Sequence, residues 1–334
     1  MPRAVTILGA GSWGTALAVH LGRVGHDVHL WARDEALARE MDVCRANATY
    51  LPEVTLPPSV SVTQAIEEAL RGTELVVAAI PSHGCRAVIR HAAPHIAPRA
   101  VLVSAVKGLE AGTLLRMSEV IAQELGPARP VVVLSGPSFA AEVARQLPTA
   151  VLAASLDADA AELVQAEFRS PYFRLYGSDD VIGVEIGGAL KNIIAIAAGV
   201  VEGLGLGHNA LAALVTRGLA ELTRLACAAG GRRETLAGLS GLGDLVLTCT
   251  GNLSRNRHVG IELARGRPLA DILAGMKMIA EGVRTTGAAL ALGARHRVEL
   301  PIATQMGEVL AGRSDVRTAI ETLMLRRQRA EHEV

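Results

Sequence analysis

The chain is short of lysine. Of its 33 basic residues only Lys107, Lys191 and Lys277 are lysines, which leaves 30 arginines. A guanidinium cannot lose its proton in a protein, whereas an ammonium can be tuned to exchange one near neutral pH, so a lysine kept in such a chain is a candidate for proton transfer. Lys107 in SAVKGLE and Lys191 in GGALKNII lie in apolar, Gly-rich settings, and we expect Lys277 to be solvated. The alternative is that all three are survivors of a composition bias.

Other shortages exclude whole classes of protein. Formal net charge is +0, so no broad nucleic-acid footprint is expected. Apolar residues make up 50% of the chain, but its longest runs, such as IIAIAAGVV, are too short to span a bilayer, so no membrane insertion is predicted. The four cysteines show no CxxC spacing and are interpreted as reduced thiols of a cytoplasmic protein, with no metal site predicted.

The length of 334 residues favours two domains. Short β-branched runs alternate with helix-period stretches in the first half, which predicts a parallel, doubly wound sheet with helices on both faces. The predicted strands are 5–10, 28–32, 75–81, 100–106, 131–136, 149–155 and 172–177. Helical periodicity dominates afterwards, up to a C-terminal helix ending in LMLRRQRAEHE. We therefore expect a dinucleotide-binding domain over 1–183 and an all-helical substrate domain over 184–334, with a ligand crevice between them.

A glycine-rich turn follows the first predicted strand and opens a helix. In Gly9-Ala10-Gly11-Ser12-Trp13-Gly14, Gly9 permits the tight turn, Gly11 lets the backbone approach a pyrophosphate, and Gly14 permits close helix–strand packing. The free N–H groups of the helix N-terminus suit phosphates. GxGxxG alone is weak evidence, but at the first strand of an alternating pattern it predicts a Rossmann-type dinucleotide site. The alternative is a purely structural turn.

The end of the second strand bears on which dinucleotide is bound. An acidic residue there would hold the ribose 2′-hydroxyl of NAD, but the chain has Ala32 followed by Arg33. An arginine suits a 2′-phosphate, so NADPH is preferred and NADH remains possible. In a chain so rich in arginine, Arg33 could also be an ordinary solvated side chain.

Several polar side chains are candidates for catalysis. Lys107 follows one predicted strand and Ser138, in SGPSFA, follows the next, so both belong to the carboxyl edge of the sheet, where such folds bind ligands. Lys191 lies on the first long helix of the second domain, where an apolar setting would lower its pKa. Asp244, in the loop GLGDL, could orient Lys191. The structural alternatives are helix N-caps at Ser138 and Asp244.

The polar run 251–257, GNLSRNR, could grip a phosphate, although such a loop is more often a solvated turn. Together with GAGSWGTALA, VKGLE, LSGPSFAAEVA, ALKNIIAIAAG, GLGDLVLTCT and AEGVRT, it appears in an order that spans nearly the whole chain. This set of motifs resembles the NAD(P)-dependent glycerol-3-phosphate dehydrogenase family, in its bacterial branch.

The resemblance implies reversible hydride transfer between NAD(P)H and dihydroxyacetone phosphate, giving sn-glycerol 3-phosphate for phospholipid synthesis, in a cytoplasmic homodimer. Lys191 matches the family's proton donor and acceptor, Lys107 would bind the substrate oxygens and contact the cofactor, and Asp244 matches a substrate contact. The other matched substrate contacts are Gly136, Ser138, Ser254, Arg255 and Asn256. The matched cofactor contacts, besides the glycines and Lys107, are Ser12, Trp13, Arg33, Ala140, Arg255, Ile279 and Glu281.

Two departures and two rival functions remain. Leu211 stands where family members commonly carry a lysine, which puts in doubt any contact that this lysine makes, and Ala141 stands where many carry a basic residue, which is interpreted as a surface change. One rival is a two-domain NADP-dependent reductase of a keto or hydroxy acid, against which GLGDL with SRNR argues. The other is a non-catalytic NADP-binding sensor, which would have no use for Lys191, Asp244 and Arg255 together.

Overall fold

The computed structural model describes residues 2–127, 129–328 and 330–331, and it divides the chain into two compact units. The first unit comprises Met1–Lys107 and Leu115–Val181, and the second comprises Gly108–Leu114 and Ile182–Val334. The boundary expected from the sequence lies two residues further along the chain. That the segment directly after Lys107 belongs to the second unit was not expected.

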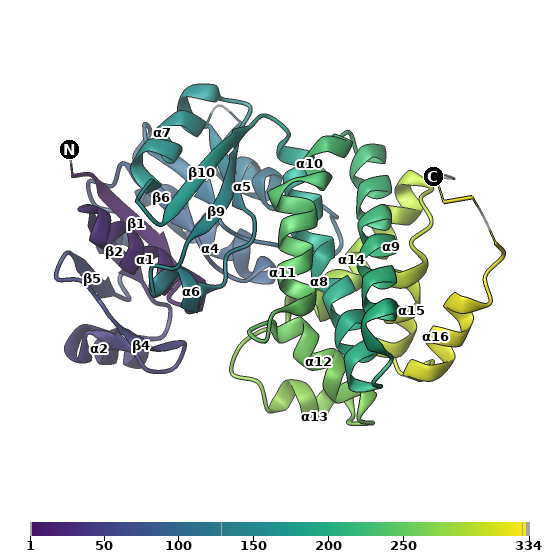
Figure 1. Ribbon diagram of the computed structural model, residues 1–334. Coiled ribbons are helices and arrows are strands. Elements are labelled where there is room, and N and C mark those ends of the chain that lie inside the picture. The colour runs from purple at the N-terminus through teal and green to yellow at the C-terminus, as the bar shows by residue number, and fades with distance from the viewer. Residues whose placement is uncertain (1, 128, 329, 332–334) are drawn as a thin grey trace. The chain divides into compact units, whose positions relative to one another are not determined.

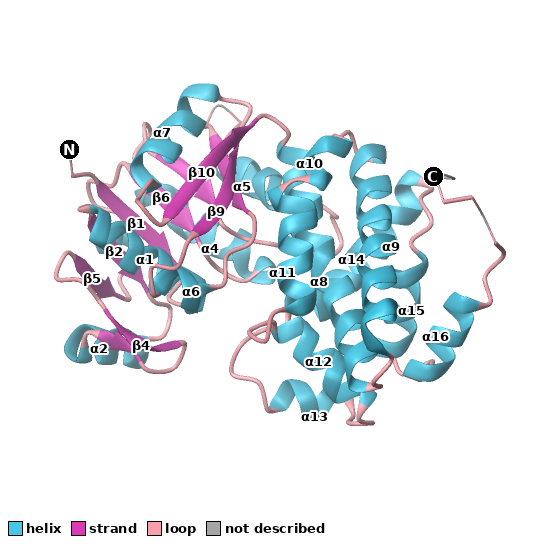
Figure 2. Ribbon diagram, viewed as in Figure 1, coloured by secondary structure: helices cyan, strands magenta, loops and turns pink. Residues whose placement is uncertain are grey.

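The first unit is built on one eight-stranded sheet in the order β10-β9-β8-β7-β6-β1-β2-β5 (Figure 2). All seven predicted strands are present, and the predicted Rossmann-type fold class is confirmed. Their apolar sequences fit a sheet covered on both faces. The strands of this sheet are β1 Ala4–Leu8, β2 Asp27–Trp31, β5 Val60–Thr63, β6 Leu75–Ala78, β7 Val101–Ser104, β8 Val131–Ser135, β9 Thr149–Ala154 and β10 Phe173–Ser178.

One strand pairing differs from the predicted parallel sheet. β8 and β9 are antiparallel, with Val133 opposite Ala154, while β9 and β10 are again parallel. Only the single-turn helix α6, Ala140–Ala144, separates β8 from β9, so the chain does not cross back to the amino edge of the sheet before β9 begins. The longer α7, Ala158–Phe168, makes that crossing before β10.

Helices pack on both faces of the sheet (Figure 1). One apolar core includes residues of α1, Ser12–Val24, and of α6 and α7, while the other includes residues of α3, α4 and α5. The last three helices are Ile66–Ala69, Cys85–Ala92 and Met117–Leu125. The helix-period stretches of the first half include the sequences of α1, α4 and α5. The helices α2, at Glu35–Cys44, and α7 were not predicted individually. Neither were the short α3, α6, β3 at Ala46–Asn47, β4 at Leu51–Thr55 and β5, because elements of a few residues carry little periodic signal.

The second unit consists of helices in its described residues, as predicted. They are α8 Val181–Gly203, α9 Gly207–Ala228, α10 Arg233–Ala237, α11 Asp244–Thr250, α12 Arg255–Ala264, α13 Leu269–Ala274, α14 Glu281–His296, α15 Pro301–Leu310 and α16 Val316–Met324, with a π-helical turn at Leu239–Gly243. α8 has the length and hydropathy of a membrane span, but 89% of its most apolar window is buried, so it is the core helix of this unit.

α8 and α12 touch backbone to backbone. A Cβ added at Gly199 of α8 would lie 1.9 Å from the Arg257 carbonyl oxygen, and one at Gly260 of α12 would lie 1.9 Å from the Ile196 carbonyl oxygen. Glycine is therefore required at both positions for this approach. The contact holds the first turn of α12 beside the centre of α8.

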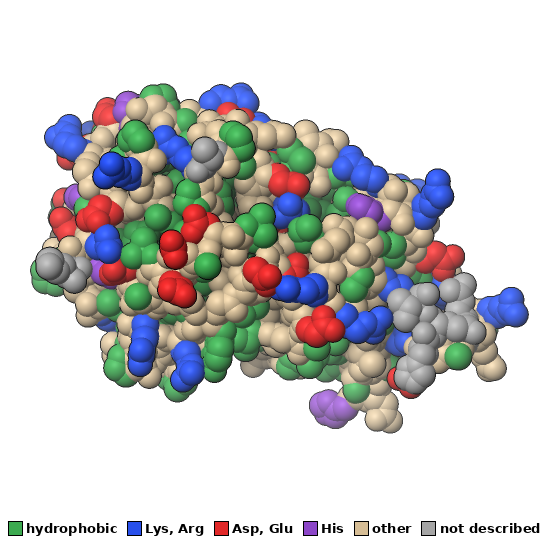
Figure 3. Space-filling view, turned by 90° about the horizontal axis from the view of Figure 1, so that it is seen from above, with side chains coloured by type: hydrophobic (Ala, Val, Ile, Leu, Met, Phe, Trp, Pro, Cys, Tyr) green, Lys and Arg blue, Asp and Glu red, His purple; other side chains and the backbone are tan. Residues whose placement is uncertain are grey.

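Two details of the predicted second domain are corrected or left open. The C-terminal helix ends at Met324, so the described residues of LRRQRAEHE are not helical, and positions 329, 332 and 333 of that stretch lie outside the described residues. Lys277 is exposed, as expected. On the face seen in Figure 3, acidic and basic side chains are interspersed, in keeping with the net charge of zero.

Candidate active site

The glycine turn has the shape that a dinucleotide loop needs. Gly9 has a φ of +115°, and a Cβ there would lie 2.7 Å from the Ala79 carbonyl oxygen. A Cβ on Gly14 would lie 1.8 Å from the Gly9 carbonyl oxygen, whereas one on Gly11 would meet nothing within 4 Å. Gly9 and Gly14 thus allow the close backbone contacts of the turn, and Gly11 leaves open space beside the backbone.

This loop fits the phosphates of a dinucleotide. The N-cap of α1 is Gly11, which has no side-chain capping hydrogen bond, and the first turn of the helix carries no acidic residue. The N-terminal end of α1 therefore keeps its favourable potential for an anion. Ser12 donates a hydrogen bond to the Tyr50 carbonyl oxygen at 2.8 Å, and the partly buried Trp13 packs against the core.

The end of β2 suits an anion more than a ribose hydroxyl. Arg33 is exposed there. Asp34 is the N-cap of α2, where its Oδ1 accepts from the Leu37 backbone N–H at 2.8 Å, and Glu35 pairs with Arg39. Both acidic side chains that follow Arg33 are thus engaged in local contacts.

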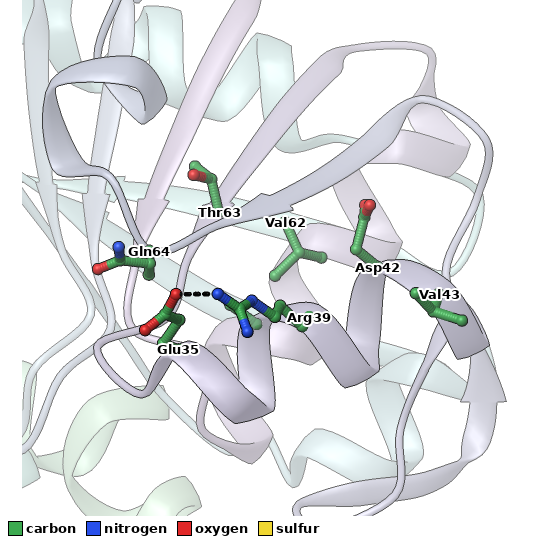
Figure 4. A pocket seen from close by; sticks show the side chains of 8 residues that line it. Glu35, Arg39, Asp42, Val43, Val62, Thr63 and Gln64 are labelled. Carbon is green, nitrogen blue, oxygen red and sulfur yellow. Dashed lines mark hydrogen bonds and ion pairs between the residues drawn. The ribbon is translucent and has the colours of Figure 1, made fainter.

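A surface pocket of about 310 Å³ lies next to this strand end, between α2 and β5. It contains no residue that the sequence analysis selected. Figure 4 shows the Glu35–Arg39 ion pair lying along its wall. Its lining consists of Glu35, Ala38, Arg39, Asp42, Val43, Val62, Thr63 and Gln64.

Two predicted substrate contacts of the first unit, Lys107 and Ser138, converge on the carbonyl oxygen of a third, Gly136. The Lys107 Nζ donates to the Gly136 oxygen at 3.1 Å, and the Ser138 Oγ donates to the same oxygen at 3.0 Å. Gly136 has a φ of +134°, and a Cβ there would lie 3.0 Å from the Val151 Cα. Because the antiparallel β9 passes behind this turn, Gly136 is fixed, and Lys107 and Ser138 are held together at the carboxyl edge. Ala140, the first residue of α6, follows directly.

In the second unit, Lys191 and Asp244 form a buried ion pair. The Lys191 Nζ lies 2.5 Å from the Asp244 Oδ1 and 2.7 Å from the Thr248 Oγ1, with side-chain exposures of 8% for Lys191 and 1% for Asp244. Asp244 does not lie in a loop, as the sequence suggested, but is the first residue of α11 after the π-helical turn. It follows that Asp244 and Thr248, four residues apart, present their oxygens on one helix face to Lys191 of α8.

Cys249, next to Thr248 in the sequence, is buried as well. The pKa of the Cys249 thiol is raised to about 12, chiefly because the thiol is buried. The nearby Lys191 charge favours the thiolate, and the Asp244 charge opposes it. The thiol therefore stays protonated and does not compete for the proton of Lys191. Thr248 also donates to the Asp244 carbonyl oxygen at 2.6 Å, which fixes its hydroxyl so that it accepts from Lys191. The ammonium is thus buried and held in a defined direction.

The SRNR segment forms the first turn of α12 rather than a loop. Ser254 is the N-cap, and its Oγ accepts from the Arg257 backbone N–H at 3.2 Å, which leaves its hydroxyl proton for another acceptor. The Asn256 Nδ2 donates to the Asn192 Oδ1, and the Asn256 Oδ1 accepts from the Gly282 N–H, both at 2.9 Å. The Asn256 amide thereby links α8, α12 and the start of α14.

Arg255 and Glu281 are the charged groups of this corner. Arg255 is exposed at the surface, yet the protein atoms around its guanidinium still remove part of its hydration, which lowers its pKa below the ordinary value; the charge of Glu281 partly offsets this. Arg255 nevertheless remains a cation, so it can meet a phosphate. Glu281 is the first residue of α14, and Ile279 lies just before it, partly buried.

The site residues thus form two groups, one in each unit. Comparison with known proteins identifies both units. The model of the NAD-dependent glycerol-3-phosphate dehydrogenase N-terminus matches residues 4–161, and that of the C-terminus matches residues 180–321. The chain belongs to the NAD-dependent glycerol-3-phosphate dehydrogenase family.

Relatives and solved structures agree with this assignment. The chain is 54% identical over 326 residues to a glycerol-3-phosphate dehydrogenase [NAD(P)+] of Koribacter versatilis, covering 96% of this chain and 97% of that one. It is 51% identical to the Geobacter sulfurreducens enzyme of the same name, with 99% of each chain covered. A crystal structure of glycerol-3-phosphate dehydrogenase from Coxiella burnetii superposes with a TM-score of 0.94 at 41% identity, covering 97% of this chain and 99% of that one.

The structure adds two residues that the sequence analysis did not select. Thr248 accepts a hydrogen bond from Lys191, and Asn192 accepts one from Asn256. The spacing of four residues between Asp244 and Thr248 could have pointed to the threonine had the loop GLGDL been recognised as a helix start. Asn192 adjoins Lys191, so it faces elsewhere on α8, and no local signal distinguished it.

The two departures from the family pattern both lie against core residues. Leu211 is partly buried and packs against the apolar core of the second unit. Ala141 is also partly buried, against the core of the first unit, so this position lies partly at the surface and partly against the core. Its small side chain lies on α6, which packs closely on α1.

Proposed function

We propose that this protein interconverts dihydroxyacetone phosphate and sn-glycerol 3-phosphate, with NADPH preferred over NADH. The observation that supports this most is the buried Lys191 ammonium held by Asp244 and Thr248. A buried, oriented cation in the same helical unit as an arginine that can bind phosphate suits reduction of a small phosphorylated ketone. Neither a sensor nor a scaffold needs such a pair.

Each group has one task in the proposed reaction. When bound, the dinucleotide supplies the hydride. As charge develops on the carbonyl oxygen, Lys191 gives it a proton, and in the reverse direction the neutral amine takes the proton from the alcohol. Asp244 stabilises the ammonium form, Thr248 directs it, and Lys107 binds substrate oxygens. Arg255, with Ser254 and Asn256, binds the phosphate.

The test is oxidation of NADPH with dihydroxyacetone phosphate, compared with pyruvate and ketopantoate. We expect turnover with the phosphoketone only. Folded protein that binds NADPH but turns over none of the three would overturn the proposal, and turnover of ketopantoate alone would favour the keto-acid reductase.

The role of Lys191 has its own test. In Lys191→Ala the kcat should fall by about 10²–10⁴-fold, the usual contribution of a positioned general acid, while NADPH binding persists. Near-normal turnover of this variant would remove Lys191 from the chemistry without removing the activity from the protein.

The cofactor preference rests on Arg33 and on the engaged acids beside it. A hydrogen bond to a charged group contributes about 1.5–3 kcal/mol, so Arg33→Ala should weaken NADPH about 10- to 100-fold and NADH much less. An equal loss for both would remove the preference. Glu40→Ala, an exposed position on α2, serves as the control.

Three finer features belong to the same proposal: supply of glycerol 3-phosphate for phospholipids, a cytoplasmic location and a homodimer. At the end of the second unit, the adjacent Met324 and Leu325 are 79% and 85% exposed, and a second subunit that packs on this end would cover them. Light scattering coupled to gel filtration measures the mass. A monomer at working concentration would contradict the dimer.

A further inference from the structure

The segment that follows α2 reaches back to the glycine turn. β3, Ala46–Asn47, and β4, Leu51–Thr55, form a small antiparallel pair outside the main sheet. Asn47 in this segment is wholly buried. It belongs to none of the motifs in the family resemblance, and the proposed reaction assigns it no task.

The Asn47 carboxamide is bonded on both sides. Its Nδ2 donates to the Ala10 carbonyl oxygen at 2.9 Å and to the Thr15 Oγ1 at 2.8 Å, and its Oδ1 accepts from the Tyr50 backbone N–H at 3.0 Å. A second link runs the other way, because Ser12 donates to the Tyr50 carbonyl oxygen. The side chain thus connects the glycine turn, the first turn of α1 and the segment around Tyr50.

The bond to Ala10 fixes the orientation of one peptide group. A trans peptide is planar, so its carbonyl and the next N–H point in opposite directions, and the described residues contain no cis peptide. Because Asn47 holds the Ala10 carbonyl, the Gly11 N–H is directed away from Asn47. Beside Gly11 the space is open, since an added Cβ would meet nothing within 4 Å.

We propose that Asn47 is a positioning residue of the cofactor site: through the Ala10 carbonyl it orients the Ala10–Gly11 peptide so that the Gly11 N–H can bind the dinucleotide pyrophosphate. This rests on the proposed dinucleotide function. Gly9 and Gly14 shape the turn by allowing close approach, but glycines impose no orientation of their own. A buried donor that is bonded at both hydrogens supplies it.

A merely structural tether is the alternative, and the chain offers a matched control for it. Arg45, at the other end of β3, holds the same segment through its Nη2, which donates to the Pro57 and Val60 carbonyl oxygens at 2.6 and 2.7 Å. In the described part of the chain, the contacts of this guanidinium are with Pro57, Val60 and Asp42 and not with the glycine turn. Arg45→Ala therefore loosens the segment without removing the bond to Ala10.

The experiment compares Asn47→Ala with Arg45→Ala in the full-length protein. Binary NADPH binding is measured by fluorescence titration, folding by thermal unfolding, and adenosine 2′-monophosphate, which has no pyrophosphate, is tested as a competitive inhibitor. Asn47→Ala should bind NADPH about 10- to 100-fold more weakly, the effect typical of removing the hydrogen-bonded partner of a ligand-binding group. The same Asn47→Ala variant should keep the wild-type inhibition by adenosine 2′-monophosphate, the wild-type KM for dihydroxyacetone phosphate and the wild-type kcat at saturating NADPH. The control Arg45→Ala should lower only the unfolding temperature.

Several results would overturn the inference. They are unchanged NADPH affinity in Asn47→Ala, an equal loss for NADPH and adenosine 2′-monophosphate, or the same loss in Arg45→Ala at a matched unfolding temperature. If Asn47→Ala does not fold, Asn47→Asp replaces it, because the carboxylate keeps the acceptor for Tyr50 and loses both donated bonds. That variant should bind NADPH more weakly than the wild type, and wild-type affinity would refute the role. Failure of the wild type to bind NADPH would instead count against the proposed function.

Discussion

Replacing Gly260 by alanine tests whether the α8–α12 contact builds the substrate side of the site. An alanine Cβ at this position would lie 1.9 Å from the Ile196 carbonyl oxygen and 2.8 Å from the Val200 backbone nitrogen. Both atoms belong to the backbone of α8, so no side-chain rotation relieves the clash. An ordinary van der Waals contact of a Cβ needs about 3.4 Å instead of 1.9 Å, so α12 has to move away from α8 by about 1.5 Å.

The retreat has a structural and a functional consequence. The Asn256–Asn192 hydrogen bond of 2.9 Å lies one turn before Gly260, and the same displacement would stretch it to about 4.4 Å, which is no longer a bond. Overpacking costs about 1–3 kcal/mol and a buried amide left unpaired about 1–3 kcal/mol, so the free energy of unfolding should fall by about 2–6 kcal/mol. Arg255 moves with the helix, so the KM for dihydroxyacetone phosphate should rise.

Denaturant unfolding followed by circular dichroism measures the stability, and steady-state kinetics measure the KM. Gly287→Ala is the matched control, because this exposed glycine lies inside α14 and its added Cβ meets nothing within 4 Å. It should be neutral or stabilise the protein by up to about 1 kcal/mol through helix propensity. Binary NADPH binding should be unchanged in both variants, since the glycine turn belongs to the first unit.

A Gly260→Ala protein that unfolds within about 1 kcal/mol of the wild type and keeps its KM would refute this prediction, because the clash would then be relieved at no cost. If the variant does not fold, Gly203→Ala gives a graded version of the same test. Its Cβ would lie 2.6 Å from the Ala264 Cβ and 3.0 Å from the Ile261 carbonyl oxygen. Wild-type stability and KM in this variant would also contradict the argument.

Two further predictions concern titration and thiol reactivity. His20 is fully buried, and desolvation lowers its pKa from 6.5 to about 4, so the unfolded chain binds more protons than the native state between these values. His20 therefore contributes about 3 kcal/mol to the free energy of unfolding above pH 6.5, and this contribution is lost as the pH falls towards 4. Chemical denaturation across this range should show that the free energy of unfolding of His20→Gln depends less steeply on pH. An unchanged slope would contradict the assignment. For the cysteines, the exposed Cys44 and Cys227 should react with a thiol reagent in the native protein, whereas the buried Cys249 with its raised pKa should react only on unfolding. Peptide mapping after brief labelling checks this, and rapid modification of Cys249 would show that its surroundings open readily.

Much of the fold and of the site could be predicted because the signals are local. The apolar runs that became β1 and β6 to β8 are buried on both faces apart from the first residues of β1, β7 and β8, so each could be recognised from its own sequence. β10, at the edge of the sheet, instead alternates buried and exposed residues. The glycine spacing at residues 9, 11 and 14 encodes a backbone shape that few other residues can adopt. β5, α2 and α6 gave no comparable signal because they are short or polar, and the antiparallel direction of β9 depends on which edge of the sheet the chain occupies, which no local pattern records.

The lysine shortage led to Lys107 and Lys191 from the sequence alone, because the chemical difference between an ammonium and a guanidinium is a property of the residue. The partners of these side chains could not be found from the residue type alone. Asp244 and Thr248 lie more than fifty residues from Lys191, and the Asn47 contact with Ala10 joins segments 37 residues apart. Such contacts depend on how helices and loops pack and on satisfying buried polar groups, which are properties of the folded chain. The sequence by itself determined the residue types, the glycine turn and the order of the elements, whereas only the tertiary structure decided which oxygen each ammonium and amide would meet.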